Sequence, residues 1–227
     1  QLILIDTGIG NKQSEKFYSY FFLEGDNSIK NNIKKYGFGP DEITDVILTH
    51  LHFDHCGGAV IKVGERSYDT TFKNANYWSN KPHWEWATKP NKREVASFLK
   101  ENIMPIKESG QLCFLEKDSG GYLTKTRLGF QVLFVDGHTE KQMIPIINYK
   151  GQKFAFAADL VPTAGHVPLP YIPGYDIRPL TSLKEKESFL NFCNENNVLL
   201  FFEHDAFEEL GLVYQTERGI RLKNTLS

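Results

Sequence analysis

The chain has 227 residues, of which 41% are hydrophobic and 13% aromatic, enough for one large domain with a hydrophobic core. Its formal net charge is −2, from 26 basic and 28 acidic residues, so no strong positive field exists to attract nucleic acid or an anionic membrane. Apolar runs are no longer than a strand, which excludes a transmembrane helix. We therefore expect one domain over residues 1–227 whose partner is a small molecule.

Cysteine usage and the first residue bear on where the protein works. Cys56, Cys113 and Cys193 are odd in number and scattered, which favours free thiols over a disulfide framework. We therefore expect a cytoplasmic protein. Because the chain starts at Gln1 and enters an apolar strand at once, we also expect it to be a fragment whose N-terminus is truncated.

The first half of the chain is expected to alternate strands and helices. Residues 2–5 form an apolar run that predicts a buried strand. A helical pattern covers residues 27–36, with Asp26 or Asn27 as its N-cap. Residues 46–48 predict the next buried strand, and the chemistry of the molecule begins directly after it.

A strand at residues 75–79 leads into a helical, aromatic-rich insert at about 80–110. Three prolines interrupt the helical pattern, which predicts two helices, with Asn91 as the cap of the second. The aromatic side chains, Trp84 among them, can wall an apolar substrate pocket, pack in the core, or become buried in a homodimer interface. The sequence leaves these three alternatives open.

The second half of the chain is expected to be mainly β-structure. Apolar patterns predict three strands, a helix and one more strand, at residues 130–135, 143–149, 153–158, 182–196 and 198–202. A tight turn is expected at 150–152 and a closing hairpin around 217–219. This order of elements predicts two sheets packed together with helices outside.

The most informative stretch is His50-Leu51-His52-Phe53-Asp54-His55. Side chains alternate along an extended segment, so His50, His52 and Asp54 point to one side. A turn after Asp54 can then bring His55 back toward them. Three imidazoles and one carboxylate within six residues are typical of a transition-metal site.

Three later strands end abruptly in a further potential ligand, which is His138, Asp159 or His204. A carboxylate at the end of an apolar strand is costly to bury unless a metal ion or strong hydrogen bonds satisfy it, so Asp159 is the most telling of the three. Taken alone, Asp159 could be a helix cap or turn acid, and His138 and His204 could each be a hydrogen-bonded core histidine. These explanations do not account for all three beside the six-residue motif.

The order and spacing of these seven residues resemble the metallo-β-lactamase-fold hydrolases, over essentially the whole chain. The resemblance implies an α+β fold, a four-layer αββα sandwich, whose first strands would precede Gln1 and be missing from the fragment. It also implies two divalent metal ions. The first would be held by His50, His52 and His138, the second by Asp54, His55 and His204, and Asp159 would bridge them.

The same resemblance assigns supporting roles around the ligands. Asp6 matches a position that supports a ligand, and a carboxylate there could hold an imidazole in one tautomer. A simple turn cap is the alternative for Asp6. Thr139 is the supporting residue expected beside His138. The family's Gly-His-Thr-x-Gly-His pattern is altered here after Thr139, since Glu140-Lys141-Gln142 follows.

Two metal ions in such a site can hold a bridging hydroxide at neutral pH, which attacks a carbonyl or phosphoryl group. We therefore expect a metal-dependent hydrolase with Asp54 and Asp159 as its catalytic carboxylates, Asp54 also serving as a proton shuttle. Nitrogen and carboxylate ligands favour zinc, with manganese, iron and cobalt as alternatives.

Within the family, the chain looks most like the quorum-quenching lactonase-like and organophosphate-hydrolase branch, so a lactone or carboxylic ester is the expected substrate. One departure is Pro162, where acyl-homoserine lactonases have a tyrosine. The expected substrate-binding residues are Phe53, Trp84, Tyr171 and Tyr175. Two alternatives stay open, namely phosphotriester hydrolysis at the same centre and a mononuclear iron enzyme of the persulfide-dioxygenase type.

Overall fold

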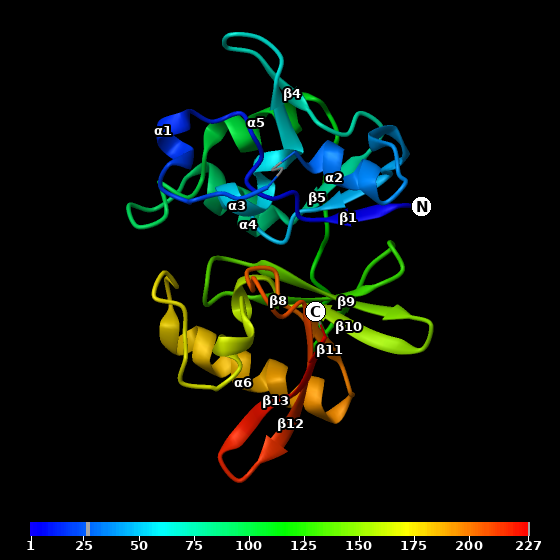
Figure 1. Cartoon of the computed structure of the whole chain (residues 1–227), viewed down its shortest axis with the longest axis vertical. Helices are drawn as coiled ribbons and strands as arrows, with labels where there is room; N and C mark the ends of the chain where they lie inside the picture. The colour runs from blue at the N-terminus through cyan, green and yellow to red at the C-terminus, as the bar shows by residue number, and fades with distance from the viewer. Residues whose placement is uncertain (26–27, 227) are drawn as a thin grey trace. The chain divides into compact units, whose positions relative to one another are not determined.

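The computed structural model describes residues 1–25 and 28–226. The chain divides into two compact units, Gln1–Glu116 and Lys117–Ser227 (Figure 1). Each unit combines a β-sheet with helices, which confirms the predicted α+β class. One domain over residues 1–227 stays a prediction, and the expected helix cap at Asp26 or Asn27 lies outside the described residues.

A parallel sheet of four strands, in the order β1-β2-β5-β6, forms the centre of the first unit. The strands are β1 (Ile3–Ile5), β2 (Asp45–Ile47), β5 (Asn76–Ser79) and β6 (Leu112–Phe114). Val46 and Ile47 in β2 are fully buried, as expected for a parallel strand covered on both faces. A separate antiparallel pair consists of β3 (Val60–Lys62) and β4 (Tyr68–Thr70). All three strands predicted in this half of the chain are present.

Helices of the first unit contribute much of its core. They are α1 (Glu15–Tyr18), α2 (Ile29–Lys35), α3 (Phe53–Cys56), α4 (Lys81–Thr88) and α5 (Lys100–Glu108), with short 3-10 turns η1 (Pro40–Glu42) and η2 (Gly57–Ala59). Ile33 from α2, Trp84 from α4 and Ile103 from α5 belong to the same buried cluster as Val46 of the sheet. The sheet is thus positioned by apolar helix faces.

The insert forms two helices, as predicted, but the second begins at Lys100 and not at Asn91. The side-chain oxygen of Asn91 instead accepts hydrogen bonds from the backbone N–H groups of Arg93 (2.8 Å) and Glu94 (3.1 Å). Asparagine forms such local turns as readily as it caps helices. The predicted cap was therefore wrong because Asn91 closes a turn of its own.

A seven-stranded sheet in the order β13-β12-β11-β10-β9-β8-β7 makes up most of the second unit. The strands are β7 (Thr124–Lys125), β8 (Gln131–Val135), β9 (Gln142–Tyr149), β10 (Gln152–Phe156), β11 (Leu199–Phe201), β12 (Leu210–Thr216) and β13 (Gly219–Leu226). Neighbouring strands are antiparallel, except that β10 and β11 are parallel. The predicted turn at 150–152 is a two-residue hairpin loop in which Lys150 and Gly151 have positive φ angles of 50° and 85°.

Helix α6 (Pro179–Glu195) packs against this sheet and extends the predicted helix by three residues at its start. Phe189, Leu190 and Cys193 of α6 are buried with Ile144 and Leu200 of the strands. The 3-10 turns η3 (Ala158–Leu160) and η4 (Ala164–His166) interrupt the long connection between β10 and α6. This connection contains Asp159 and contacts His138 through Tyr175 and Asp176.

Two further expectations concern the whole chain. Cys56, Cys113 and Cys193 are free thiols, as predicted. No helix within residues 1–25 and 28–226 is both long and apolar enough to cross a bilayer. A cytoplasmic location and a homodimer stay predictions.

Candidate functional site

In the first unit, parallel strands β1 and β2 bring Asp6 and Thr49 together at their carboxyl ends. The Asp6 carboxylate accepts hydrogen bonds from the Thr49 backbone N–H (2.7 Å) and the Thr49 hydroxyl (2.6 Å). Asp6 itself has a φ of 51°, a left-handed conformation that aspartate tolerates better than most residues. Asp6 therefore fixes Thr49, the residue that directly precedes the histidine motif.

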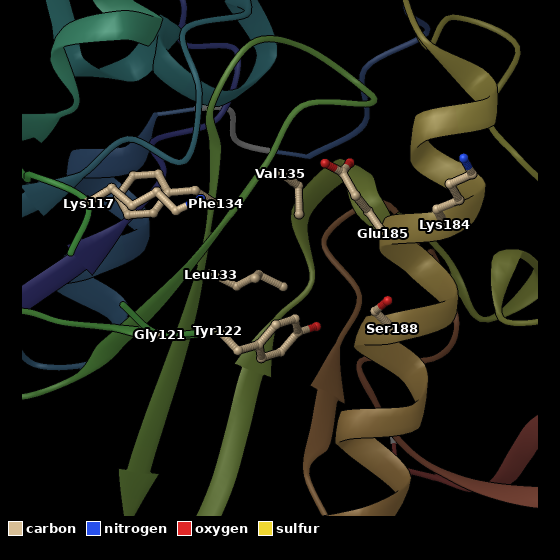
Figure 2. A pocket seen from close by; sticks show the side chains of 9 residues that line it. All are labelled: Lys117, Gly121, Tyr122, Leu133, Phe134, Val135, Lys184, Glu185 and Ser188. Atoms are coloured by element: carbon tan, nitrogen blue, oxygen red, sulfur yellow. The ribbon is translucent and has the colours of Figure 1, made fainter. Parts of the chain in front are cut away.

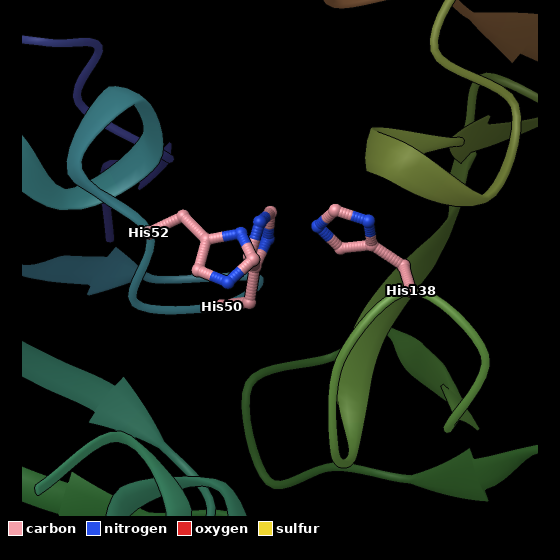
Figure 3. Close-up of side chains that lie close together, drawn as sticks. All are labelled: His50, His52 and His138. Atoms are coloured by element: carbon pink, nitrogen blue, oxygen red, sulfur yellow. The ribbon is translucent and has the colours of Figure 1, made fainter. Parts of the chain in front are cut away.

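Three imidazoles are packed together after β2. His50 and His55 are fully buried, and His52 is nearly so. The His50 ring lies 3.9 Å from that of His55 and 4.6 Å from that of His52, centroid to centroid. Figure 3 shows the rings of His50 and His52 next to each other. Imidazoles at this spacing would repel one another if protonated, whereas neutral rings each offer a nitrogen lone pair to a metal. The donor set of this unit therefore fits a transition metal.

One nitrogen of each ring contacts an oxygen that orients the ring. His55 Nδ1 lies 2.9 Å from Asp6 Oδ2, and His50 Nδ1 lies 3.1 Å from the Thr49 hydroxyl. His52 Nε2 faces a Glu94 carboxylate oxygen at 3.5 Å. Oxygen partners on one ring nitrogen are the usual means of fixing a ligand's tautomer. The candidate ligand atom is then Nε2 in His50 and His55 and Nδ1 in His52.

Asp54 occupies the first turn of α3, where its Oδ2 lies 3.8 Å from His55 Nε2, the candidate ligand atom of that ring. Its side chain is 35% exposed, unlike the buried imidazoles. The end of α3 is fixed by glycine packing, since a Cβ on Gly57 would lie 2.1 Å from the carbonyl oxygen of Ile9. Asp54 therefore combines a position beside a ligand with access to solvent.

In the second unit, Asp159 lies between two imidazoles. Its Oδ2 is 3.3 Å from His138 Nε2, and its Oδ1 is 3.0 Å from His204 Nε2. Two ligands about 2.1 Å from one metal at a tetrahedral angle are about 3.4 Å apart. Each oxygen of one buried carboxylate thus faces a different histidine, at spacings that fit a carboxylate shared between two metal ions.

Parallel pairing of β10 and β11 explains why Asp159 and His204 meet. Phe156 pairs with Phe201 at the ends of these strands, and each ligand follows its paired residue by three positions. His138 reaches Asp159 from the loop that joins β8 to β9 and is labelled in Figure 3. The predicted ligands of this unit are therefore brought together by sheet register.

His138 is supported by residues that sequence reasoning missed. Its Nδ1 lies 3.0 Å from Asp176 Oδ1, and the Ser182 hydroxyl donates to Asp176 Oδ2 at 2.5 Å. Glu185 accepts the backbone N–H groups of Asp136 (2.8 Å) and Gly137 (2.9 Å), just before His138. Figure 2 shows Glu185 next to Val135, at one end of a pocket of about 310 Å³. Nothing local in the sequence marks these residues.

Departures from the family's pattern after His138 have a structural explanation. Lys141 has a φ of 52°, a conformation that favours the glycine of that pattern. Both its backbone N–H and its ammonium bind the Asp136 carboxylate, at 2.6–3.0 Å. Burial raises the pKa of Asp136, but the bonds from Lys141 outweigh burial and hold it below its usual value. Thr139, the expected supporting residue, is fully buried beside His138.

The four predicted substrate-binding residues have different surroundings. Phe53 packs its ring against Phe17 (5.3 Å) and Phe21 (5.0 Å). The Tyr175 ring meets the edge of His138 at 5.4 Å and is half exposed. Trp84 is buried in the core of the first unit, and Tyr171 is exposed. Tyr175 therefore contacts a candidate ligand, Phe53 is next to two candidate ligands in the sequence, and Trp84 packs in the core.

His83 also contributes to the motif segment, although the sequence did not assign it a role there. It is fully buried, and its Nε2 accepts the backbone N–H of Leu51 at 2.8 Å. The bond fixes the main chain between His50 and His52. A histidine from the insert thereby orients the loop that carries the ligands.

Known proteins resemble this chain over most of its length. The family model of the metallo-beta-lactamase superfamily matches residues 1–204, a range that contains all seven candidate ligands. The N-acyl homoserine lactonase of Bacillus thuringiensis is 25% identical over 226 residues, which cover 91% of this chain and 78% of that protein.

Two solved structures share its fold. A protein from Staphylococcus aureus, described as a probable metal-dependent hydrolase, has a TM-score of 0.82 and 26% identity, over 99% of this chain and 79% of the other. AidC, a dizinc quorum-quenching lactonase in complex with a hexanoyl-homoserine product, has a TM-score of 0.75 and 20% identity, over 99% of this chain and 76% of the AidC chain. These likenesses confirm the predicted fold.

Proposed function

Because this chain belongs to the metallo-beta-lactamase superfamily and is a metal-dependent hydrolase, we propose that it uses two divalent metal ions to hydrolyse a lactone or a related carboxylic ester. The observation that carries the proposal is the position of Asp159, whose two carboxylate oxygens face His138 and His204 separately. A carboxylate that served one metal would not need both oxygens directed at different imidazoles.

The proposal requires the ligands of the two units to share the metals. One metal would take His50, His52 and His138, the other would take Asp54, His55 and His204, and Asp159 would bind both. Supporting this, the rings of His50, His55 and His138 each contact an oxygen through Nδ1, which leaves Nε2 as the ligand atom. Zinc is the preferred ion because the ligands are imidazoles and carboxylates, and AidC is a dizinc enzyme.

The protein groups have separate tasks in the proposed hydrolysis. Two bound divalent cations supply a water of lowered pKa and a Lewis acid for the carbonyl group. Asp159 is nearly fully buried and acts as a ligand, whereas the 35% exposed Asp54 can pass a proton between the site and the leaving oxygen. Tyr175, whose ring lies on the edge of His138, can donate its hydroxyl to a substrate oxygen.

An aromatic cluster in the first unit indicates the kind of substrate. Phe17, Phe21 and Phe53 pack together, and Phe53 stands between two candidate ligands in the sequence. Phe21 is partly exposed and Phe22 is almost completely exposed. An apolar surface of this kind suits a hydrocarbon tail beside the reacting carbonyl. An acyl lactone, on which the named relatives act, meets this requirement.

The test measures metal content and substrate preference together. The purified chain is loaded with zinc and assayed for hydrolysis of N-hexanoyl homoserine lactone, a simple ester and a phosphotriester. We expect two zinc ions per chain and the highest rate on the lactone or ester. Asp159→Asn should lose one or both metals and reduce the rate at least about a hundredfold, as the loss of a shared ligand implies.

Two outcomes would overturn the proposal. One iron per chain with oxygen uptake on a persulfide would favour the mononuclear dioxygenase alternative. A preference for the phosphotriester would keep the dinuclear centre but refute the substrate class. Asp205→Asn is a matched control in the second unit, because Asp205 lies next to His204 in sequence but, among the described residues, accepts only backbone N–H groups, those of Phe207 and Glu208 in its own loop and that of Ala164 in η4.

A further inference from the structure

A buried lysine of α6 binds the long connection that follows Asp159. Lys186 is fully buried, and its ammonium donates to three backbone carbonyls, those of His166 (2.9 Å), Pro168 (3.2 Å) and Tyr171 (2.7 Å). Three donors is the full capacity of an ammonium group. All three acceptors belong to one segment, so Lys186 gathers residues 166–171 around a single point.

Burying this lysine is costly, which argues for a specific role. Removal from water lowers the pKa of Lys186 to about 8, and the charge of Asp176 offsets only part of this effect. A leucine or methionine would fill the same volume without the desolvation penalty. What a leucine or methionine cannot supply is a donor that binds three main-chain carbonyls at once, although the Pro168 carbonyl also accepts the Tyr171 backbone N–H at 3.0 Å.

The same helix holds the other end of the connection. Ser182, four residues before Lys186 and so on the same face of α6, donates to Asp176. Nearby, the backbone N–H groups of Ile177 and Arg178 donate to the carbonyls of His138 and Gly137. Residues 166–176 are thus fixed at two points one helical turn apart on α6.

Between these two points the connection carries Tyr175, the residue that meets the ring of His138. A connection of this length with little secondary structure is usually functional, and here its anchoring to α6 helps to fix the tyrosine's position. We propose that Lys186 is the positioning residue of this connection, which sets where Tyr171 and Tyr175 meet the substrate and thereby determines substrate affinity and selectivity. This inference rests on the proposed function for its substrate.

The test compares Lys186→Met with the zinc-loaded wild-type chain. Methionine keeps the length and volume of the side chain but removes all three donors. The matched control is Lys184→Met, because Lys184 lies two residues away on α6 (Figure 2), is exposed, and has no hydrogen bond to these carbonyls among the described residues. For Lys186→Met we expect faster hydrogen exchange within residues 166–175, unchanged zinc content, and a KM raised about tenfold with kcat within about threefold. Lys184→Met should match the wild type.

A merely structural role would give a different pattern. Zinc content and kcat would then fall together while KM stayed constant, and that result would overturn the proposal. The proposal would also be overturned if Lys186→Met had the same hydrogen-exchange rates within residues 166–175 and the same KM as the wild type. If Lys186→Met does not fold, Lys186→Gln, which keeps two donors, replaces it, and failure of both variants to fold also overturns the proposal.

Failure of the proposed function gives a separate signature. A wild-type chain that hydrolyses no lactone or ester would refute that function. Hydrogen exchange would still decide whether Lys186 fixes residues 166–175, and binding of hexanoyl-homoserine by the zinc-loaded proteins would decide whether it positions them. Weaker binding by Lys186→Met alone supports the proposal, whereas equal binding overturns it.

Discussion

Replacing Asp6 with asparagine should weaken metal binding at the first unit's histidines without removing a ligand. The Asp6 carboxylate is almost fully buried and contacts Thr49 through two hydrogen bonds and His55 Nδ1 at 2.9 Å. An asparagine keeps one oxygen for the Thr49 N–H but turns the other group into a donor. His55 Nδ1 can then only accept, which moves the ring proton to Nε2, the proposed ligand atom.

The magnitude follows from the contacts that are lost. Partners that orient a ligand histidine typically contribute about 10–100-fold to metal affinity, which is about 1.4–2.7 kcal/mol. A hydrogen bond to a buried charged acceptor contributes about 1.5–3 kcal/mol, in the same range. We therefore expect Asp6→Asn to lower the affinity for one of the two metal ions about 10–100-fold, and the affinity for the other metal ion by less.

Competition titration with a zinc chelator measures this effect. Asp45→Asn is the matched control, since Asp45 is a buried carboxylate of the same sheet whose oxygen accepts the indole N–H of Trp78 at 2.8 Å and contacts no candidate ligand. The control should lose stability to urea but keep both zinc affinities. Zinc affinities in Asp6→Asn equal to those of the control would refute the tautomer argument.

Three further predictions concern other parts of the molecule. Asp176→Asn should lower the affinity for the metal ion bound by His138 about 10–100-fold, because the asparagine amide would again move the ring proton from Nδ1 to Nε2. An unchanged zinc affinity in the chelator titration would contradict this. Gly57→Ala should lower the unfolding free energy by about 1–3 kcal/mol, because its Cβ would meet the Ile9 carbonyl, whereas Gly64→Ala, with 3.4 Å to its nearest atom, should be neutral in urea unfolding. The pKa of Lys186 is lowered to about 8 in the folded chain, from an ordinary value of 10.5. Between these two pH values the unfolded chain binds more protons than the folded chain, so folding becomes more favourable as the pH rises. The unfolding free energy of the wild type relative to Lys186→Met should therefore rise between about pH 8 and pH 10.5. A pH-independent difference in urea unfolding would show that the lysine titrates normally.

Local patterns predicted the parts of the site that depend on local geometry. The histidine motif, the strands that end before His138, Asp159 and His204, and the hairpin loop at Lys150 are set by alternation and spacing within a few residues. The supporting groups could not be predicted in this way. Asp176 lies 38 positions from the histidine it contacts, and no periodicity connects the two.

Two wrong or incomplete expectations have the same origin. Asn91 has the residue type of a helix cap, but Glu94 is drawn inward by the Trp86 indole N–H (2.8 Å) and the Asn91 amide, so a compact turn forms instead. Trp84 was expected at a pocket wall, in the core or in an interface, and tertiary packing placed it in the core. In both cases contacts between distant positions decided among options that were locally equivalent.

Register between β10 and β11 has a consequence for how this enzyme can diversify. Asp159 and His204 are brought together by the pairing of the strands that precede them, and the His204 backbone N–H also donates to the Pro162 carbonyl at 3.1 Å. That intervening chain includes the tyrosine-bearing connection and α6. On the proposed function, substitutions in residues 167–175, which follow the segment bonded to His204 and Asp205, should change which molecules are accepted while the strand register that pairs Asp159 with His204 is kept. The proposed metal ligands and the proposed substrate-contacting tyrosines thus lie in different segments, which would make residues 167–175 a favourable place for new specificities to arise.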